Sequence, residues 1–513
     1  MSDDGFTRIE ANDLKPVAVV AQSLDNQWVP RSVLAQMLAR GEGLDDVQAL
    51  RDRNVSAEFR RALLTSEQVV VNRVYLYNNA SVSTEYREFS DRRSAFGELL
   101  KGGAIVPYLF VESSPTEPPG RMDVDQESVF AWERLCEEFP PTCLRLSWDD
   151  RENARATNEF LSNRFHKFAQ TLNLLDAANL LVDLGYPSND LPTKPFSRRL
   201  RDVARYAMDV SDDDTRVTRN LLYEKFISAE DTDVTAGIYD KNKPFASELK
   251  QLLDLSYNVN LPDAIDRFPL TPIDSLHRTA LQELLLERQP AGIGSDELAH
   301  HLKQAAFSLS QGFSRERAKD AKRKTAALTD MLNGLSLPTI VKVRNESSAW
   351  LTYIARVRDL LDDPLSFAKG GADRVFEGYS DLLRHAGEVE AADSGGRIGE
   401  RLVPGAALIV EAGGAVLTIL IGEDTAMQVG GAVGSIVGGK ALPIVVRLVT
   451  GGFTRRRQLA AISSSVDIMR RQLVDGKREW SRIVDELSNE PSFAVLPSAR
   501  AGHHVANMGE SDR

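Results

Sequence analysis

Cysteine is nearly absent from this sequence, since only Cys136 and Cys143 occur in 513 residues. Two cysteines cannot build a disulfide framework, and their spacing is not that of a metal site. The first residues are acidic and polar, with neither the basic nor the apolar stretch of a secretory signal peptide. These absences favour a cytoplasmic protein whose two thiols are buried in its core.

Excess positive charge is also lacking. The chain has 62 basic and 74 acidic side chains, which gives a net charge of -12. This balance opposes broad attraction to nucleic acid or to anionic lipid, although a local basic patch can still act. We therefore expect no specific nucleic-acid partner. With 42% hydrophobic and 27% charged residues, the composition is that of a globular protein, so any membrane segment is local.

Catalytic and cofactor signatures are missing as well. The histidines have neither metal-ligand spacing nor a nucleophile beside them. Residues 434–441 nearly spell a phosphate-binding loop, but Ala441 replaces the hydroxyl residue that would bind magnesium, and Pro443 follows it. We therefore predict no cofactor and no metal, and we favour a non-enzymatic protein. An enzyme whose site is assembled from distant residues stays open as an alternative.

The chain is long enough to fold as several domains. Residues 1–112 mix β-branched and aromatic runs, typical of short strands, with helical segments, which predicts a small mixed α/β N-terminal domain. Prolines at 113–125 predict a linker. Residues 126–390 have mostly helical periodicity and predict a helical domain.

The C-terminal part has a different composition. Residues 391–400 are small and polar, which predicts a hinge before an apolar region. We interpret residues 391–490 as a glycine-rich apolar hairpin followed by an amphipathic helix, and residues 491–513 as a disordered tail. The predicted fold class is therefore mainly α, a multi-helix bundle or array with a small mixed α/β N-terminal region and a C-terminal apolar helical hairpin.

Residues 402–452 form the longest apolar stretch, in two arms separated by a short acidic turn. Each arm is close to the ~20 residues that a helix needs to cross a bilayer. Glu411 lies in the first arm and Lys440 in the second, and a charge at the bilayer centre costs about 2.5 to 3.5 kcal/mol. These two residues would need each other, water or neutralisation. The basic flank, which would stay on the cytoplasmic side, comprises Arg447, Arg455, Arg456 and Arg457.

Glycine spacing in the second arm indicates close helix packing. Gly430, Gly434 and Gly438 recur at every fourth residue, as in the small-residue motifs that let helix backbones approach. Gly413 and Gly414 in the first arm could form the opposing surface. We therefore expect residues 402–452 to contact a lipid bilayer or another copy of the chain.

The layout of the C-terminal part is similar to that of the helical pore-forming domains of colicins, in which amphipathic helices cover an apolar hairpin. This resemblance is one of layout without a shared motif, and it implies a conditional membrane-inserting or pore-type effector. We therefore predict a non-enzymatic, mainly helical cytoplasmic protein that engages membranes through residues 402–452. The alternative is a soluble oligomeric scaffold or regulator that uses its glycine-rich helices for protein packing.

Overall fold

The structure, a computed structural model, describes residues 5–420 with gaps, and residues 476–485. The longest gaps are residues 25–36, 118–124, 146–162, 230–239, 271–294, 311–320, 421–475 and 486–513. Helix dominates, with 72% of the described residues. The prediction of a mainly helical protein is therefore confirmed.

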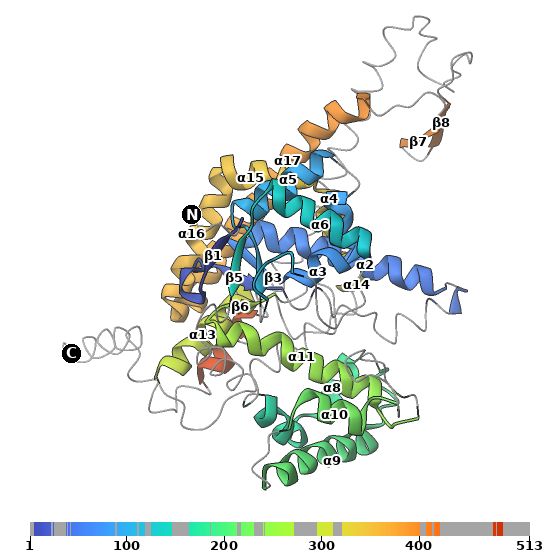
Figure 1. Cartoon of the computed structure of the whole chain (residues 1–513), viewed down its shortest axis with the longest axis vertical. Helices are drawn as coiled ribbons and strands as arrows, with labels where there is room; N and C mark the ends of the chain where they lie inside the picture. The colour runs from blue at the N-terminus through green and yellow to red at the C-terminus, as the bar shows by residue number, and fades with distance from the viewer. Residues whose placement is uncertain are drawn as a thin grey trace, which may run out of the picture.

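A six-stranded parallel sheet lies at the centre of the molecule (Figure 1). Its spatial order is β1-β5-β4-β3-β2-β6. The strands are β1 (Thr7–Ile9), β2 (Ala18–Val20), β3 (Gln68–Asn72), β4 (Ile105–Leu109), β5 (Thr142–Arg145) and β6 (Phe268–Pro269). Consecutive residues of β3, such as Val69 and Val70, which point to opposite faces of the sheet, are equally buried. A strand that is covered on both faces is apolar along its whole length, so the sequences of these strands do not alternate between apolar and polar residues.

Helices from the N-terminal part cover one face of the sheet. After β2 come α2 (Leu44–Thr65), β3 and then α3 (Arg73–Asn78), α4 (Ala80–Arg87) and α5 (Ser90–Lys101); α6 (Gln126–Glu138) joins β4 to β5. Phe59 of α2 and Phe96 of α5 pack in one hydrophobic cluster with Val69 and Ile105 of the sheet. A short 3-10 turn, η1 (Ala11–Asp13), lies between β1 and β2.

A second hydrophobic core is built from the segment between β5 and β6. Its elements are η3 (Leu172–Leu174), α8 (Ala177–Asp183), α9 (Thr193–Asp212), α10 (Arg219–Phe226) and α11 (Ala246–Ala264). Helix α11 joins this core to the sheet, because Leu249 packs in the second core whereas Leu261 packs against the sheet. Figure 1 shows α8, α9 and α10 at the lower end of the molecule.

The remaining helices are α13 (Ser295–Ser310), α14 (Ala321–Gly334), α15 (Leu337–Glu346), α16 (Ser348–Asp362) and α17 (Ala372–Glu400), with η5 (Pro364–Ser366) and η6 (Phe367–Gly371) before α17. Helices α14, α15 and α16 pack on α2, whereas α13 and α17 pack on α16, and Phe307 of α13 stacks on Phe268 of β6. Their buried side chains belong to the same cluster as those of α2 and α5. The domain boundaries predicted above stay predictions, but strands on both sides of residue 112 share the sheet.

Helix α17 continues to Glu400, so the hinge predicted at residues 391–400 is helical. Each glycine in this stretch costs a helix about 1 kcal/mol relative to alanine, but no proline is present to end it. In Figure 1, α17 runs from the main core to the upper end of the molecule.

Two antiparallel strands follow α17, β7 (Ala407–Ala412) and β8 (Ala415–Leu420). Ala412 pairs with Ala415, so only Gly413 and Gly414 separate the strands. The helical form predicted for the first apolar arm is therefore wrong for these residues. Two glycines between runs rich in Val, Ile and Leu are typical of a tight β-hairpin, and this local signal prevails. The second arm lies outside the described residues.

Candidate functional site at the carboxyl ends of the strands

The sheet has a topological switch point between β4 and β5. The chain passes from β2 through β3 and β4 to β5 in spatial order, and then crosses back to β6 at the far edge. The helices that connect β2, β3, β4 and β5 pack with Val69 and Ile105 on one face of the sheet. Leu261 and Ile265, in the connection from β5 to β6, pack on the opposite face. In open parallel sheets, ligands bind beyond the carboxyl ends of the strands at such a point. The side chains at this edge therefore form the candidate site.

Asn72 and Tyr108 join the carboxyl ends of β3 and β4. Asn72 is the last residue of β3, and its Oδ1 accepts a hydrogen bond of 3.0 Å from the backbone N–H of Val74, which caps α3. Its Nδ2 donates to the hydroxyl oxygen of Tyr108 at 3.3 Å. Tyr108 is buried. This amide and phenol thus place two hydrogen-bonding groups at the edge where a ligand is expected.

Arg73 is fully buried and holds the segment that follows β4. Its Nη1 donates to the carbonyl oxygens of Pro115, at 3.2 Å, and of Glu117. Its Nη2 lies 3.4 Å from Oε1 of Glu112, while its Nε has no hydrogen-bond acceptor among the described residues. The indole N–H of Trp132 also donates to the Pro115 carbonyl, at 2.9 Å. Residues 112–117 are therefore fixed across the ends of β3 and β4.

Hydroxyl and carboxylate groups accumulate on this fixed segment. The Glu117 carboxylate accepts hydrogen bonds from the backbone N–H and the hydroxyl of Ser113, at 2.6 and 2.7 Å. These bonds, led by that of the Ser113 hydroxyl, lower the pKa of Glu117, so it stays ionised. Ser114 and Thr116 share a hydrogen bond of 2.9 Å between their hydroxyl oxygens. These hydrogen bonds within residues 113–117 hold the conformation of the segment.

The two thiols are unsuited to nucleophilic chemistry. Cys136 in α6 and Cys143 in β5 are both buried, as the sequence predicted. Burial raises the pKa of both thiols far above neutrality, so they stay protonated. Among the described residues, no group of three or more His, Cys, Asp or Glu side chains is placed to hold a metal ion. The residues described at this edge therefore show no catalytic pair.

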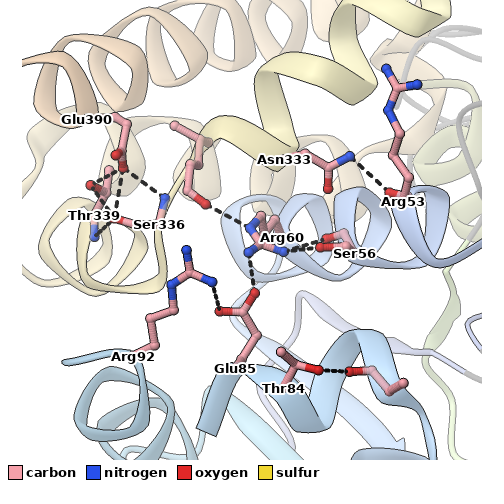
Figure 2. A network of polar contacts seen from close by, with 12 residues as sticks. Arg53, Ser56, Arg60, Thr84, Glu85, Arg92, Asn333, Ser336, Thr339 and Glu390 are labelled. Carbon is pink, nitrogen blue, oxygen red and sulfur yellow. Dashed lines mark hydrogen bonds and ion pairs between the residues drawn. The ribbon is translucent and has the colours of Figure 1, made fainter. Parts of the chain in front are cut away.

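A second polar network lies away from this edge, between the helical layers (Figure 2). Arg60 of α2 is buried and ion-paired with Glu85 of α4, and its Nε donates to the Leu335 carbonyl at 2.7 Å. Arg92 lies 3.6 Å from the other carboxylate oxygen of Glu85. Each of these contacts joins two helices or a helix and a loop. We therefore assign this part of the network to the fold, since it ties α2, α4 and α5 to the turn before α15.

Glu390 of α17 forms the other half of the same network (Figure 2). Its Oε2 accepts hydrogen bonds from the backbone N–H and hydroxyl of Ser336, each at 2.8 Å, and from the hydroxyl of Thr339 at 2.6 Å. Ser336 caps the N-terminus of α15. The negative charge of Glu390 at this helix end is favourable, so the contact fixes α15 against α17.

Of the site residues predicted from the sequence, only Glu411 is among the described residues. Glu411 is in β7, where it pairs with Val416. Those outside the described residues are Gly413, Gly414, Gly430, Gly434, Gly438, Lys440, Arg447, Arg455, Arg456 and Arg457. The residues at the carboxyl edge of the sheet were not predicted. A polar pair directly after the apolar run of β3, Asn72 and Arg73, is the signal that could have indicated them.

No family model matches the chain, and comparisons with curated proteins and with solved structures found no match either.

Proposed function

We propose that this is a cytoplasmic, non-enzymatic protein that engages lipid bilayers through residues 402–452 under particular conditions. The observation that carries this proposal is the pair of apolar arms, each close to the ~20 residues of a membrane span, inside a chain of otherwise polar surface. Among the helices that the structure describes, none combines the length and apolar character of a membrane span.

The flanks of this segment support a hairpin arrangement. On one side, α17 starts inside the main core, where Val375 and Tyr379 are buried. On the other side, Lys477 forms hydrogen-bonded ion contacts of 2.6 and 2.7 Å with Asp373 at the start of α17. Trp480 is buried, 5.0 Å from Phe367 between ring centroids. Because both flanks are fixed to the same core, a segment that enters a bilayer must return to the side it left.

The strand pair β7–β8 makes the engagement conditional. A two-stranded hairpin has unpaired backbone N–H and C=O groups along its outer edges, and these groups cannot be satisfied inside hydrocarbon. Lipid would therefore favour conversion of this arm to helix, in which every backbone group pairs within the segment. Glycine costs a helix stability in water, but it is common in membrane helices that pack closely.

Liposome flotation tests this proposal with the full chain and a variant lacking residues 402–452. The variant keeps about 24 residues between α17 and Lys477, which reach up to roughly 80 Å. They need to cover about 40 Å, the length of α17. Both anchors can therefore persist, and near-ultraviolet circular dichroism checks that the core still folds. We expect the full chain to float with anionic vesicles and the folded deletion variant to stay behind. Equal recovery of both proteins in the soluble fraction would overturn the proposal.

The four-residue glycine spacing favours a second candidate, a soluble scaffold or regulator that self-associates through the same residues. A leucine in place of Gly434 would separate helix backbones that pack there. In this case Gly434→Leu lowers the assembly mass in size-exclusion chromatography with light scattering and leaves vesicle flotation unchanged. An unchanged mass would contradict self-association through these glycines.

A further inference from the structure

Four basic side chains lie in one line along the exposed face of α9. They follow each other at intervals of four, three and four residues, which places them on the same side of a helix. All four are exposed, whereas Phe196 and Leu200 on the opposite side are buried in the second core. We name this line the α9 stripe; it consists of Lys194, Arg198, Arg201 and Arg205.

The charges of the α9 stripe are not neutralised by the protein. Within the described part of the chain, none of the four forms an ion pair, and Arg201 only donates to the Ser197 carbonyl, at 3.3 Å, in its own helix. Two acids adjoin the stripe, since Asp202 and Asp209 follow Arg198 and Arg205 by four residues, but neither forms an ion pair with them among the described contacts. Asp202 also interacts with Arg199, which is not part of the stripe. Four cations are therefore available to an external anion.

This arrangement is unfavourable for the helix itself. Lys194 lies in the first turn of α9, where the helix dipole disfavours positive charge. Two pairs in the stripe, Lys194 with Arg198 and Arg201 with Arg205, are like charges four residues apart, which destabilise a helix. Asp202 and Asp209, four residues after Arg198 and Arg205, offset part of this repulsion. Local features that oppose stability are expected at functional surfaces.

We propose that the α9 stripe binds the phosphate backbone of a nucleic-acid duplex without reading its sequence. The stripe covers eleven residue steps, or about 16 Å at the rise of an α-helix. Each strand of a duplex carries one phosphate per ~3.4 Å along the axis, so about five phosphates match this length. Three of the four cations are arginines, whose planar guanidinium groups can contact phosphate oxygens in pairs. The net charge of the whole chain does not prevent such a local contact.

A bilayer fits this surface less well. A basic amphipathic helix binds lipid by burying its apolar face among the headgroups, but the apolar face of α9 is already buried in the protein. Figure 1 also shows α9 at the opposite end of the molecule from the end of α17. A bilayer that contacts the residues after α17 would therefore not meet the α9 stripe.

A single strand fits less well than a duplex because no aromatic platform adjoins the stripe on α9. The one aromatic residue near that face, Tyr206, is half-buried, and the ammonium group of Lys225 lies 3.9 Å from its ring centre. Single-strand binding depends on bases stacking on open aromatic rings. The phosphates of a duplex need only the line of cations.

Fluorescence anisotropy with a labelled 20-base-pair DNA duplex tests this inference on the full chain. With four phosphate contacts, the slope of log K against log salt concentration is expected near -3.6, so binding weakens about 150-fold between 50 and 200 mM salt. The triple variant Arg198→Gln, Arg201→Gln, Arg205→Gln should reduce the slope to near -0.9. The corresponding triple lysine variant keeps the charge and should keep the slope.

The matched control removes three exposed helical cations elsewhere, with Lys101→Gln, Arg134→Gln and Arg374→Gln. Both glutamine variants change the net charge equally, and we expect the control to retain duplex affinity within about twofold, since the contact is local. Equal weakening of both variants, or no duplex binding by the unmodified chain at 50 mM salt, would overturn the proposal. A lipid surface is tested with anionic vesicles and the chain lacking residues 402–452. If the arginine-to-glutamine changes weaken its binding to vesicles but not to the duplex, the proposal is overturned in favour of lipid.

Discussion

Arginine side chains around the sheet and those on the exposed face of α9 have opposite roles. Around the sheet, Arg60 and Arg73 are only 3% and 1% exposed and contact carboxylates and backbone carbonyls. On α9, in the second core, Arg198 and Arg205 are exposed and form no ion pair within the described residues. The buried arginines, Arg60 and Arg73, hold segments of the chain together. The N–H donors of the exposed arginines, Arg198 and Arg205, remain available to a partner. The burial and the partners of an arginine, rather than its residue type, therefore show whether it stabilises the fold or is available to bind a ligand.

Arg344 is the strongest case of a buried arginine that holds segments together. Its guanidinium group donates to the carbonyls of Leu63, Ser66 and Glu67, at 2.7 Å for the last two, and it stacks over the Trp350 ring. A helix leaves its last four carbonyls without intrahelical partners, so Arg344 caps α2 from α15. Burial lowers the pKa of Arg344 to about 10, which still leaves it charged at neutral pH.

Removal of Arg344 should have the largest effect on stability. Arg344→Ala leaves carbonyls at the end of α2 without donors, at about 1 to 3 kcal/mol for each that stays buried. We expect the free energy of unfolding to fall by about 4 kcal/mol, measured by urea denaturation followed with near-ultraviolet circular dichroism. Arg384→Ala is the control, because Arg384 and its partner Asp381 are both exposed; it should cost less than about 1 kcal/mol. A loss below 1 kcal/mol for Arg344→Ala would show that the cap is not needed.

Removal of Arg60 from the buried pair Arg60–Glu85 should reduce stability less than Arg344→Ala does, and removal of both partners should reduce it less still. Arg60→Met leaves the Glu85 carboxylate buried with only Arg92 nearby, at 3.6 Å, and should cost about 3 kcal/mol. The double variant Arg60→Met, Glu85→Leu removes both charges and should recover most of this loss, because burying the pair costs solvation energy. A double variant that is less stable than Arg60→Met alone would mean that the charges themselves stabilise the helical layers.

Local patterns sufficed to predict much of the helical part and two strands. The β-branched runs predicted short strands within residues 1–112, where β3 and β4 lie, and the helical periodicity of residues 126–390 predicted the region that contains α9, α13 and α16. Strands β5 and β6 were missed because they are short and their positions depend on pairing with distant segments. For residues 407–420 the length of the apolar run suggested helix, although Gly413 and Gly414 carried the local hairpin signal.

Apart from the polar pair Asn72 and Arg73, the candidate site could not be predicted because its contacts join residues that are distant in the sequence. Pro115 lies in the stretch predicted to be a linker, since proline cannot donate a backbone hydrogen bond. Its carbonyl can still accept, and it receives donors from both Arg73 and Trp132. The α9 helix was predicted from its apolar period, but its stripe was not singled out. Whether the surrounding acids neutralise those arginines is decided by the fold.

Substitution of the α9 stripe should have the smallest effect on the free energy of unfolding, and this effect should be of opposite sign. Replacing Arg198, Arg201 and Arg205 by glutamine removes no ion pair and keeps a residue of similar helix propensity. It also removes like-charge repulsion of about 0.2 to 0.5 kcal/mol per pair along the helix. Thermal unfolding should therefore show unchanged or slightly raised stability, within about 1 kcal/mol, while duplex binding is lost. A loss of stability comparable to that of Arg60→Met would show that these arginines hold the fold together, as Arg60 does. They could not then be free to bind a partner, because the same donors cannot serve both roles.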